Sequence, residues 1–301
     1  MIAPKPLCLR ETGLSHSQIR LCQRHFDHMP VISVGAKIGI EECHERFKFR
    51  QWNCSSIGES VAFGPEINIG SREAGFAHAI SAAGVVHALA RSCKESRLKS
   101  CSCGNDERPT QLHRDWIWGG CGDNIKYGYQ FAKKFIDIRE TEKSASLQSV
   151  YRSAHVSCKC HGISGSCSLR TCWTQLAPFS KVGQYLQDKY DSSIQVGFNR
   201  PGTMLKRSRR DAPRITSEDL IYLEDSPDYC RMDQVTGKTA TSGRECLLDG
   251  SSSESCESLC CGRGFLTHSR IVSEKCHCRF HWCCEVECQT CQRVERYHIC
   301  N

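Results

Sequence analysis

The cysteines constrain this chain more than any other feature of its sequence. Of the 24 cysteines, twelve lie between Cys8 and Cys172, none lies between Trp173 and Tyr229, and twelve more lie between Cys230 and Cys300. Reduced proteins rarely keep so many thiols unless the thiols bind metal, so this even number favours disulfides made in an oxidising compartment. We therefore expect two cross-linked domains separated by a segment without cysteine.

Zinc is the alternative use for so many cysteines. The stretch 276–291 is rich in potential ligands and contains one CxxC pair, at 288–291. Structural zinc sites usually repeat that pair at a matched spacing. Here adjacent cysteines such as 260–261 and 283–284 dominate instead, together with CxC steps. The pattern favours disulfides, and we predict no metal site.

The two cysteine blocks differ in the structure that their sequences predict. Residues 1–195 contain an alanine-rich helical pattern at 69–93 and weaker helical patterns, which fall at 31–50, 122–140 and 173–193. Residues 196–228 contain three prolines and the basic run KRSRR at 206–210, which is typical of a linker. Residues 229–301 carry a cysteine about every six residues and are too few for a large hydrophobic core, so short strands held by bridges are expected.

The stretch CKCHGISGSCSLRTCW at 158–173 indicates a stapled hairpin. Pairing of Cys158 with Cys172 and of Cys160 with Cys167 would place Ser164 near its tip. A serine at the tip of a rigid hairpin, flanked by glycines, is suited to being modified or bound by a partner, and poorly suited to filling a core. The alternative is an ordinary hairpin whose serines merely favour the turn.

A catalytic role for Ser164 is a weaker interpretation. The nucleophile turn of hydrolases requires Gly-x-Ser-x-Gly, whereas the run 162–166 reads GISGS. His161 lies three residues away, but no carboxylate follows in the context of a triad. A secreted hydrolase that uses Ser164 and His161 therefore remains only an alternative.

A second hairpin is indicated by CHCRFHWCCEVECQTC at 276–291. Nested pairs of its outer cysteines would present Phe280 and Trp282 at the tip, beside a vicinal Cys283–Cys284 disulfide. Exposed Phe and Trp side chains are typical interface anchors. The alternative is that both rings pack back on the small domain.

Several short signals bear on localisation and modification. Asn53-Cys54-Ser55 is an N-glycosylation acceptor in a secreted protein, and Arg207–Arg210 fits either a furin-type cleavage site or a solvated charge run. The net charge of +7 suits acidic polysaccharide more than nucleic acid, and it equally fits a plain basic surface. The first 13 residues show no export signal, and no run of 18 apolar residues predicts a membrane span.

Five motifs together closely resemble the Wnt family of secreted lipid-modified signalling proteins, from about Cys22 to Cys300. They are FRQWNCSS at 49–56, CKCHGISGSC with TCW at 158–173, YLEDSPDYC at 222–230, GRECL at 243–247 and the hairpin at 276–291. The resemblance implies a disulfide-rich α+β fold. It comprises a saposin-like helical domain at 1–195 that carries the hairpin 158–172, a linker at 196–228, and a cystine-knot-like or cytokine-like domain of short strands at 229–301.

The resemblance also implies function. A Wnt is a non-enzymatic developmental ligand in the extracellular space and matrix, which grips the cysteine-rich domain of a Frizzled receptor with two fingers. Ser164 is expected to carry a palmitoleoyl group added by Porcupine, with no other cofactor. The second contact is expected at Phe280, Trp282, Cys283 and Cys284. Further expected partners are the carrier Wntless, a co-receptor of the LDL-receptor-related class and, as a candidate, heparan sulfate. A matrix or glycan-binding protein without the lipid is the remaining alternative.

The disulfide pairing that the resemblance implies can be stated in full. It joins Cys43 with Cys54, Cys93 with Cys101, Cys103 with Cys121, Cys158 with Cys172, Cys160 with Cys167, Cys230 with Cys261, Cys246 with Cys256, Cys260 with Cys300, Cys276 with Cys291, Cys278 with Cys288, and Cys283 with Cys284. Cys8 and Cys22 are left to pair with each other. No bridge crosses the linker, so we expect a cut after Arg210 to separate the two domains and to abolish bivalent binding.

Two departures from the family pattern are visible. The stretch between Glu140 and Cys158 is shorter than in typical Wnts and lacks their Asn-Asn-Glu-Ala-Gly-Arg run, and the export signal is missing. The first departure affects the packing of one helix of the N-terminal domain. Neither departure touches the two hairpins.

Overall fold

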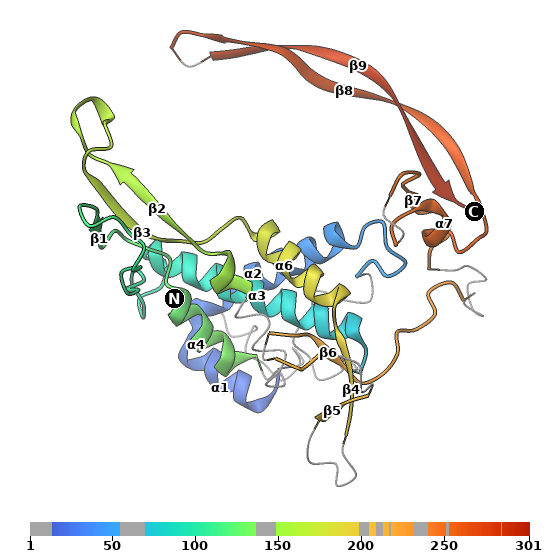
Figure 1. Ribbon diagram of the computed structural model, residues 1–301, viewed down its shortest axis with the longest axis horizontal. Helices are drawn as coiled ribbons and strands as arrows, with labels where there is room; N and C mark the ends of the chain where they lie inside the picture. Colours follow the sequence, from blue (N-terminus) through green and yellow to red (C-terminus); the bar gives the residue numbers. More distant parts are fainter. Residues whose placement is uncertain are drawn as a thin grey trace, which may run out of the picture. The chain divides into compact units, whose positions relative to one another are not determined.

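The computed structural model divides into two compact units. It describes residues 14–54, 70–136, 149–198, 205–208, 213–216, 218–231, 240–250, 253–283 and 285–301. The first unit comprises Met1–Arg46 and Cys54–Ser226, and the second comprises Phe47–Asn53 and Pro227–Asn301. The fold is α+β, with long helices in the first unit and a long β-ribbon in the second (Figure 1).

The helices of the first unit lie close to the predicted ranges, apart from the first two, which were not predicted. They are α1 (His16–Arg24), the 3₁₀ turn η3 (Phe26–His28), α2 (Met29–Arg46), α3 (Arg72–Lys94), α4 (Ile125–Phe135) and α6 (Phe179–Asp191). The Ser71 hydroxyl accepts a hydrogen bond from the N–H of Ala74 and so fixes the start of α3. Helix α6 begins later than predicted because Trp173 belongs to a strand and Pro178 is the helix N-cap.

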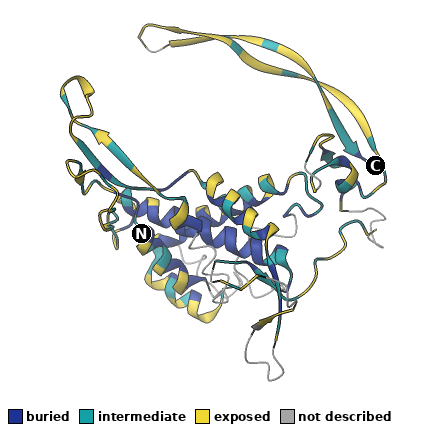
Figure 2. Cartoon of the chain, viewed as in Figure 1, coloured by how far each residue is buried: buried dark blue, intermediate teal, exposed yellow. Residues whose placement is uncertain are grey.

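Helix α3 is the centre of the first unit. Almost all of its residues are buried, as the dark helix in Figure 2 shows. It meets α2 at glycines: a Cβ atom on Gly35 would lie 2.7 Å from the carbonyl oxygen of Gly84, and one on Gly39 would lie 2.7 Å from that of Ile80. The backbones of the two helices therefore touch directly, which only glycine permits.

We expect Gly84→Ala to lower the free energy of unfolding by about 2–3 kcal/mol. The added methyl group would overlap the carbonyl oxygen of Gly35, which is backbone and cannot rotate away. Thermal unfolding followed by the helical circular dichroism signal measures the effect. Gly197→Ala is the control, because its methyl group would meet only the Ser208 hydroxyl, at 3.8 Å. Equal midpoints for both variants would contradict this packing.

His78 makes the first unit sensitive to acid. It lies in α3, only 5% of its surface is exposed, and neither ring nitrogen has a hydrogen-bond partner among the described residues. Burial lowers the pKa of His78 from 6.5 to about 4. Between these values the unfolded chain binds a proton that the folded protein does not bind. The stability contributed by neutral His78 is therefore present above about pH 6.5 and is lost as the pH falls towards 4.

We expect the free energy of unfolding to fall by about 3 kcal/mol through His78 between neutral pH and pH 4. His78→Phe keeps a buried ring without a titrating group, so it should flatten this dependence. Urea unfolding at pH 7, 5.5 and 4.5 tests the expectation. Identical pH profiles for the variant and the parent would rule out His78 as the source.

The described strands of the first unit form two small sheets. One has the order β1 (Ile117–Trp118), β3 (Arg170–Gln175), β2 (His155–Cys160). The other has the order β5 (Leu205–Arg207), β4 (Ile194–Phe198), β6 (Ile221–Tyr222).

The segment 196–228 was expected as a linker, but most of what is described of it is folded into the first unit. Strand β4 extends into it, and β5 and β6 lie within it. The N–H groups of Leu223 and Glu224 both donate to the carbonyl oxygen of Gly70, at 2.8 and 2.9 Å. Lys189 also pairs with Asp219 at 3.0 Å. The boundary between the units therefore falls at 226/227, because backbone pairing outweighs the turn-forming composition.

The second unit is built on one long hairpin. Strand β8 (Phe265–His281) pairs antiparallel with β9 (Glu285–Cys300), and β7 (Glu245–Cys246) adds a short edge beside the helical turn α7 (Cys256–Leu259). Strands of 17 and 16 residues are longer than the short strands predicted from the cysteine density. Two-stranded ribbons are marginal alone, and covalent cross-links between the strands supply the missing stability.

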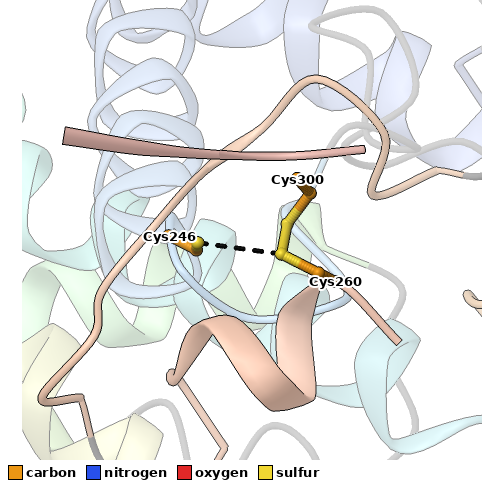
Figure 3. Close-up of side chains that lie close together, drawn as sticks. All are labelled: Cys246, Cys260 and Cys300. Carbon is orange, nitrogen blue, oxygen red and sulfur yellow. Dashed lines mark hydrogen bonds between the residues drawn. A yellow bond between two sulfur atoms is a disulfide. The ribbon is translucent and has the colours of Figure 1, made fainter. Parts of the chain in front are cut away.

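Cystine sulfur fills the core of the second unit. The buried cluster consists of Leu259 and four half-cystines, with Phe265 packed against it: Cys246, Cys256, Cys260 and Cys300. The sulfur atoms of Cys246 and Cys260, which belong to different disulfides, lie 3.7 Å apart (Figure 3). Cross-links thus take the place of the apolar side chains that a larger domain would bury.

Ten disulfides are described, and their pairing is the one that the resemblance implies: 43–54, 93–101, 103–121, 158–172, 160–167, 230–261, 246–256, 260–300, 276–291 and 278–288. Cys22 is also disulfide-bonded. Its expected partner Cys8, and the Cys284 of the expected vicinal pair, lie outside the described residues. Among the described residues no helix is long and apolar enough to cross a bilayer.

Candidate functional site

The hairpin formed by β2 and β3 in the first unit is held by two cross-links. Cys158 and Cys172 are direct partners in the strand register, and their Cα atoms lie 4.1 Å apart. Nearer the tip, the Cα atoms of Cys160 and Cys167 lie 4.6 Å apart across the second bridge. Because one cross-link ties the stem and the other closes the loop, the tip cannot open without breaking a covalent bond.

Glycine and a left-handed serine shape the tip. The N–H of Gly162 donates to the carbonyl oxygen of Ser166 at 2.8 Å, and a Cβ atom on Gly162 would come within 2.5 Å of the same oxygen. Ser164 lies inside the 3₁₀ turn η4 (Ile163–Gly165) with φ 58° and ψ 26°. Residues other than glycine rarely adopt this left-handed backbone conformation. The hairpin therefore holds Ser164 in a conformation that the free chain would avoid.

The hairpin that carries Ser164 also exposes two apolar side chains. Ile163, the preceding residue, is 92% exposed, and Leu169 is 44% exposed. The ring nitrogen Nε2 of His161 lies 3.0 Å from the hydroxyl of Thr171, and no hydrogen bond joins His161 to Ser164 among the described residues. His161 is thus engaged with Thr171 on the neighbouring strand, and its position does not favour the hydrolase alternative.

Trp116 supports the base of the hairpin, a role that the sequence does not suggest. The guanidinium group of Arg170 lies 4.4 Å from the centre of the Trp116 ring, and its Nε donates to the carbonyl oxygen of Cys167 at 3.2 Å. Arg170 thus links the loop-closing disulfide to an aromatic side chain from a separate loop. Only the aromatic run DWIW at 115–118 could have drawn attention to this loop.

The tip of the β8–β9 hairpin in the second unit exposes large aromatic rings. Phe280 is 70% exposed and Trp282 is 94% exposed, so neither ring packs back on the domain. His281 pairs with Glu285 at the end of the ladder, and Cys283 lies in the turn with φ 71°. The cross-links 276–291 and 278–288 lie just below this tip, with a β-bulge between Cys276 and Arg279.

The predicted glycosylation triplet at Asn53 and the predicted cleavage run at 206–210 are only partly described. Asn53 is half-buried and belongs to the second unit, while Ser55 of its acceptor triplet lies outside the described residues. Lys206 and Arg207 are exposed, and Arg207 ends strand β5; Arg209 and Arg210 lie outside the described residues. Glycosylation and cleavage therefore stay predictions.

Two groups of potential metal ligands gather in the described residues of the second unit. One contains Cys246, Cys260 and Cys300, and the other contains Cys276, His277 and Cys291. Every cysteine in both groups is a member of a disulfide. Metal ions bind thiolates rather than disulfide sulfur, so neither group offers the ligands of a zinc site.

Together, these features define a class of cystine-rich protein that presents one exposed serine hydroxyl and one aromatic cluster on two separate stapled hairpins. The chain belongs to the Wnt family, whose sequence profile it matches over residues 10–301. Wnt-5b of Xenopus laevis is 46% identical over 319 residues, covering 100% of this chain and 88% of the relative. Wnt-5a of Ambystoma mexicanum is 45% identical, covering 100% of this chain and 89% of the relative.

Two solved structures are also similar. One is WNT8A in the complex of human WLS with WNT8A, which is 34% identical with a TM-score of 0.64 and covers 90% of this chain and 93% of that chain. The other is the N-terminal domain and linker of Drosophila WntD, with 23% identity and a TM-score of 0.51. It covers 67% of this chain and 98% of that chain. The second likeness shows the fold alone. Wnt proteins are signalling ligands, and the chain is a ligand of that family.

Proposed function

We propose that this chain is an extracellular ligand of Frizzled receptors that binds their cysteine-rich domain through both hairpins. Ser164 carries a palmitoleoyl chain, which enters an apolar groove of the receptor. The aromatic tip of Phe280 and Trp282, with Cys283 and Cys284, forms the second contact. The observation that carries the proposal is an exposed serine, held in a left-handed backbone conformation at the tip of a doubly cross-linked hairpin.

The energetics support a lipid at this position. Each buried methylene of an acyl chain contributes about 0.8 kcal/mol, so one chain can outweigh the polar contacts of a small tip. Ile163 and Leu169 would extend the apolar contact around the chain, since both side chains are exposed in the free protein. The rigid hairpin lowers the entropic cost of placing the chain in a groove.

The same lipid explains the other proposed partners. An exposed acyl chain makes a free protein poorly soluble, so acylation by Porcupine would be followed by transfer to the carrier Wntless. The similar WNT8A chain was solved in complex with human WLS, which is consistent with this step. A co-receptor of the LDL-receptor-related class and heparan sulfate complete the set of proposed extracellular partners. The acyl group is the only prosthetic group that the proposal requires.

Mass spectrometry of the peptide that contains the Cys160–Cys167 disulfide tests the proposal. We expect secreted, active protein to carry one monounsaturated sixteen-carbon acyl group on this peptide, with fragmentation placing it on Ser164. The neighbouring exposed serines Ser166 and Ser168 serve as internal controls within the same peptide region. Unmodified Ser164 in active material would refute the acylation and with it the lipid-in-groove mechanism.

A further inference from the structure

Residues 47–53 connect the two units in an unexpected way. This segment, FKFRQWN, belongs to the second unit, although its neighbours Arg46 and Cys54 belong to the first. The chain therefore passes between the units at three places: 46/47, 53/54 and 226/227. The sequence indicates only the last of these, because the first two lie inside an apparently continuous N-terminal domain.

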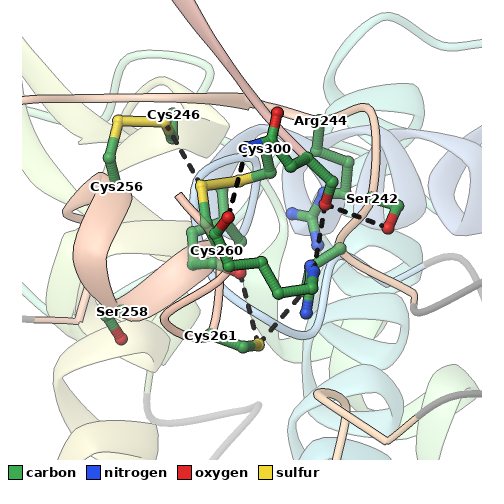
Figure 4. Close-up of a disulfide and its surroundings, with 12 residues drawn as sticks. Ser242, Arg244, Cys246, Cys256, Ser258, Cys260, Cys261 and Cys300 are labelled. Atoms are coloured by element: carbon green, nitrogen blue, oxygen red, sulfur yellow. Dashed lines mark hydrogen bonds between the residues drawn. A yellow bond between two sulfur atoms is a disulfide. The ribbon is translucent and has the colours of Figure 1, made fainter. Parts of the chain in front are cut away.

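Arg244 holds this segment in the second unit. Its Nη1 donates to the carbonyl oxygen of Gln51 at 2.7 Å, and its Nη2 donates to the carbonyl oxygens of Arg50 and Lys48 at 2.6 and 3.0 Å. Arg244 itself is fixed beside the Cys260–Cys300 disulfide, since the N–H of Cys300 donates to its carbonyl oxygen at 3.0 Å (Figure 4). Burial lowers the pKa of the Arg244 side chain.

Only an arginine fits this arrangement. A turn closed by the bond from the N–H of Arg50 to the carbonyl oxygen of Phe47 aims three carbonyl groups towards one point. The planar guanidinium group offers several N–H donors in fixed directions, whereas a lysine offers a single compact centre. No carboxylate shares in these three bonds, so the recognition is of backbone shape rather than of charge.

Other contacts extend the recognition beyond Arg244. The side-chain amide of Gln51 donates to the carbonyl oxygen of Ser258 at 3.1 Å, and the guanidinium group of Arg50 lies 3.6 Å from the carboxylate of Glu254. Within the segment, the rings of Phe47 and Trp52 pack edge to face at 4.9 Å, with exposed fractions of 0% and 6%. The segment is thus bound through main-chain and side-chain contacts, and its two rings are buried.

A disulfide prepares the segment for binding. Cys43 and Cys54, which flank it, are bonded to each other with Cα atoms 6.0 Å apart. The segment is therefore a closed loop in the first unit's covalent framework. Closing a loop beforehand reduces the conformational entropy that is lost when the loop docks.

We infer that residues 47–53 are an internal ligand of the C-terminal unit, that Arg244 is its anchor, and that this contact keeps the units joined after the connecting chain is cut. None of the ten described disulfides links a residue before 227 to one after it. Proteolysis in the basic run at 206–210 would then yield a two-chain molecule, not separated halves. This inference concerns the fold of the chain and does not depend on a receptor.

A cut placed at the boundary tests the inference. A recognition site for a specific protease is inserted between Pro227 and Asp228, which are both exposed. The full-length folded protein is cut and then passed over a sizing column under native, non-reducing conditions. We expect the two pieces to elute together, and we expect Arg244→Ala to raise their dissociation constant by at least about thirtyfold, because charge-assisted bonds to three carbonyl groups are lost. Separation of the parent pieces at micromolar concentration would overturn the inference.

Matched variants separate anchoring from general stability. Arg263 donates to Asn301 and Thr241 within the same unit and makes no described hydrogen bond to residues 47–53, so Arg263→Ala should leave the dissociation constant within about threefold. Arg244→Lys should behave nearly as Arg244→Ala, because it keeps the charge and loses the fork of donors. Gln51→Ala, which retains Arg244, should raise the constant by about threefold to tenfold. Equal constants for the Arg244→Ala, Gln51→Ala and parent pieces would overturn the inference.

Discussion

We expect Ser164→Ala to lower the affinity of this chain for a Frizzled cysteine-rich domain by at least about a thousandfold. Alanine cannot be acylated, and the burial of about six methylene groups in an apolar groove is enough to account for that factor. Titration of an immobilised receptor domain with matched concentrations of secreted protein, by biolayer interferometry, measures the change. The fold should be unaffected, because the Ser164 side chain is exposed at the tip.

Ser168→Ala is the matched control for this experiment. Ser168 is an exposed serine on the same hairpin, and its hydroxyl lies 3.3 Å from the neighbouring hydroxyl of Ser166. The affinity of the Ser168→Ala protein for the receptor domain should stay within about twofold of that of the parent. A Ser164→Ala protein that binds within tenfold of the parent would show that the lipid is not the main contact.

Trp282→Ala should be the second most damaging change, with a loss of receptor affinity of about thirtyfold or more. Truncation of a central aromatic anchor commonly costs at least about 2 kcal/mol of binding free energy. Trp282 is 94% exposed in the free protein, so its removal should leave the thermal unfolding midpoint unchanged. The same receptor titration, combined with a thermal scan, distinguishes lost binding from lost folding.

Ile271→Ala provides the comparison for Trp282. Ile271 lies on the stem of the same hairpin, opposite Val294, and is 69% exposed. It lies ahead of both stapled pairs in the chain, so its truncation should leave affinity within about twofold. Equal losses for Ile271→Ala and Trp282→Ala would place the contact along the whole ribbon rather than at its tip.

The two hairpins were predictable because their cysteine spacing acts locally. Cysteines separated by one residue on a strand point to the same face, so a CxC step facing a second pair predicts two cross-links and a tip. The positions of Ser164 and Trp282 at the two tips follow from this spacing, whereas the roles expected for them came from the resemblance. The pairing of the remaining cysteines does not, because so many cysteines allow a very large number of connectivities; it came from the resemblance to a family.

The association of residues 47–53 with the second unit could not be predicted. FRQWN lies between a helix and a half-cystine of the first unit, and nothing in its composition shows that its carbonyl groups meet Arg244 almost two hundred residues later. The folding of 205–226 into the first unit was missed for a similar reason. Its strands are only two or three residues long, and long-range pairing rather than local propensity forms them.

The core of the second unit makes its folding an oxidation reaction. Leu259 is the one fully apolar side chain among the four half-cystines of the cluster, so apolar burial within this cluster contributes little free energy when those sulfur atoms are thiols. The redox potential of the surroundings then strongly affects whether this cluster forms. A reducing compartment would therefore disfavour the folded second unit, and the hairpin that carries Trp282 would form in an oxidising compartment.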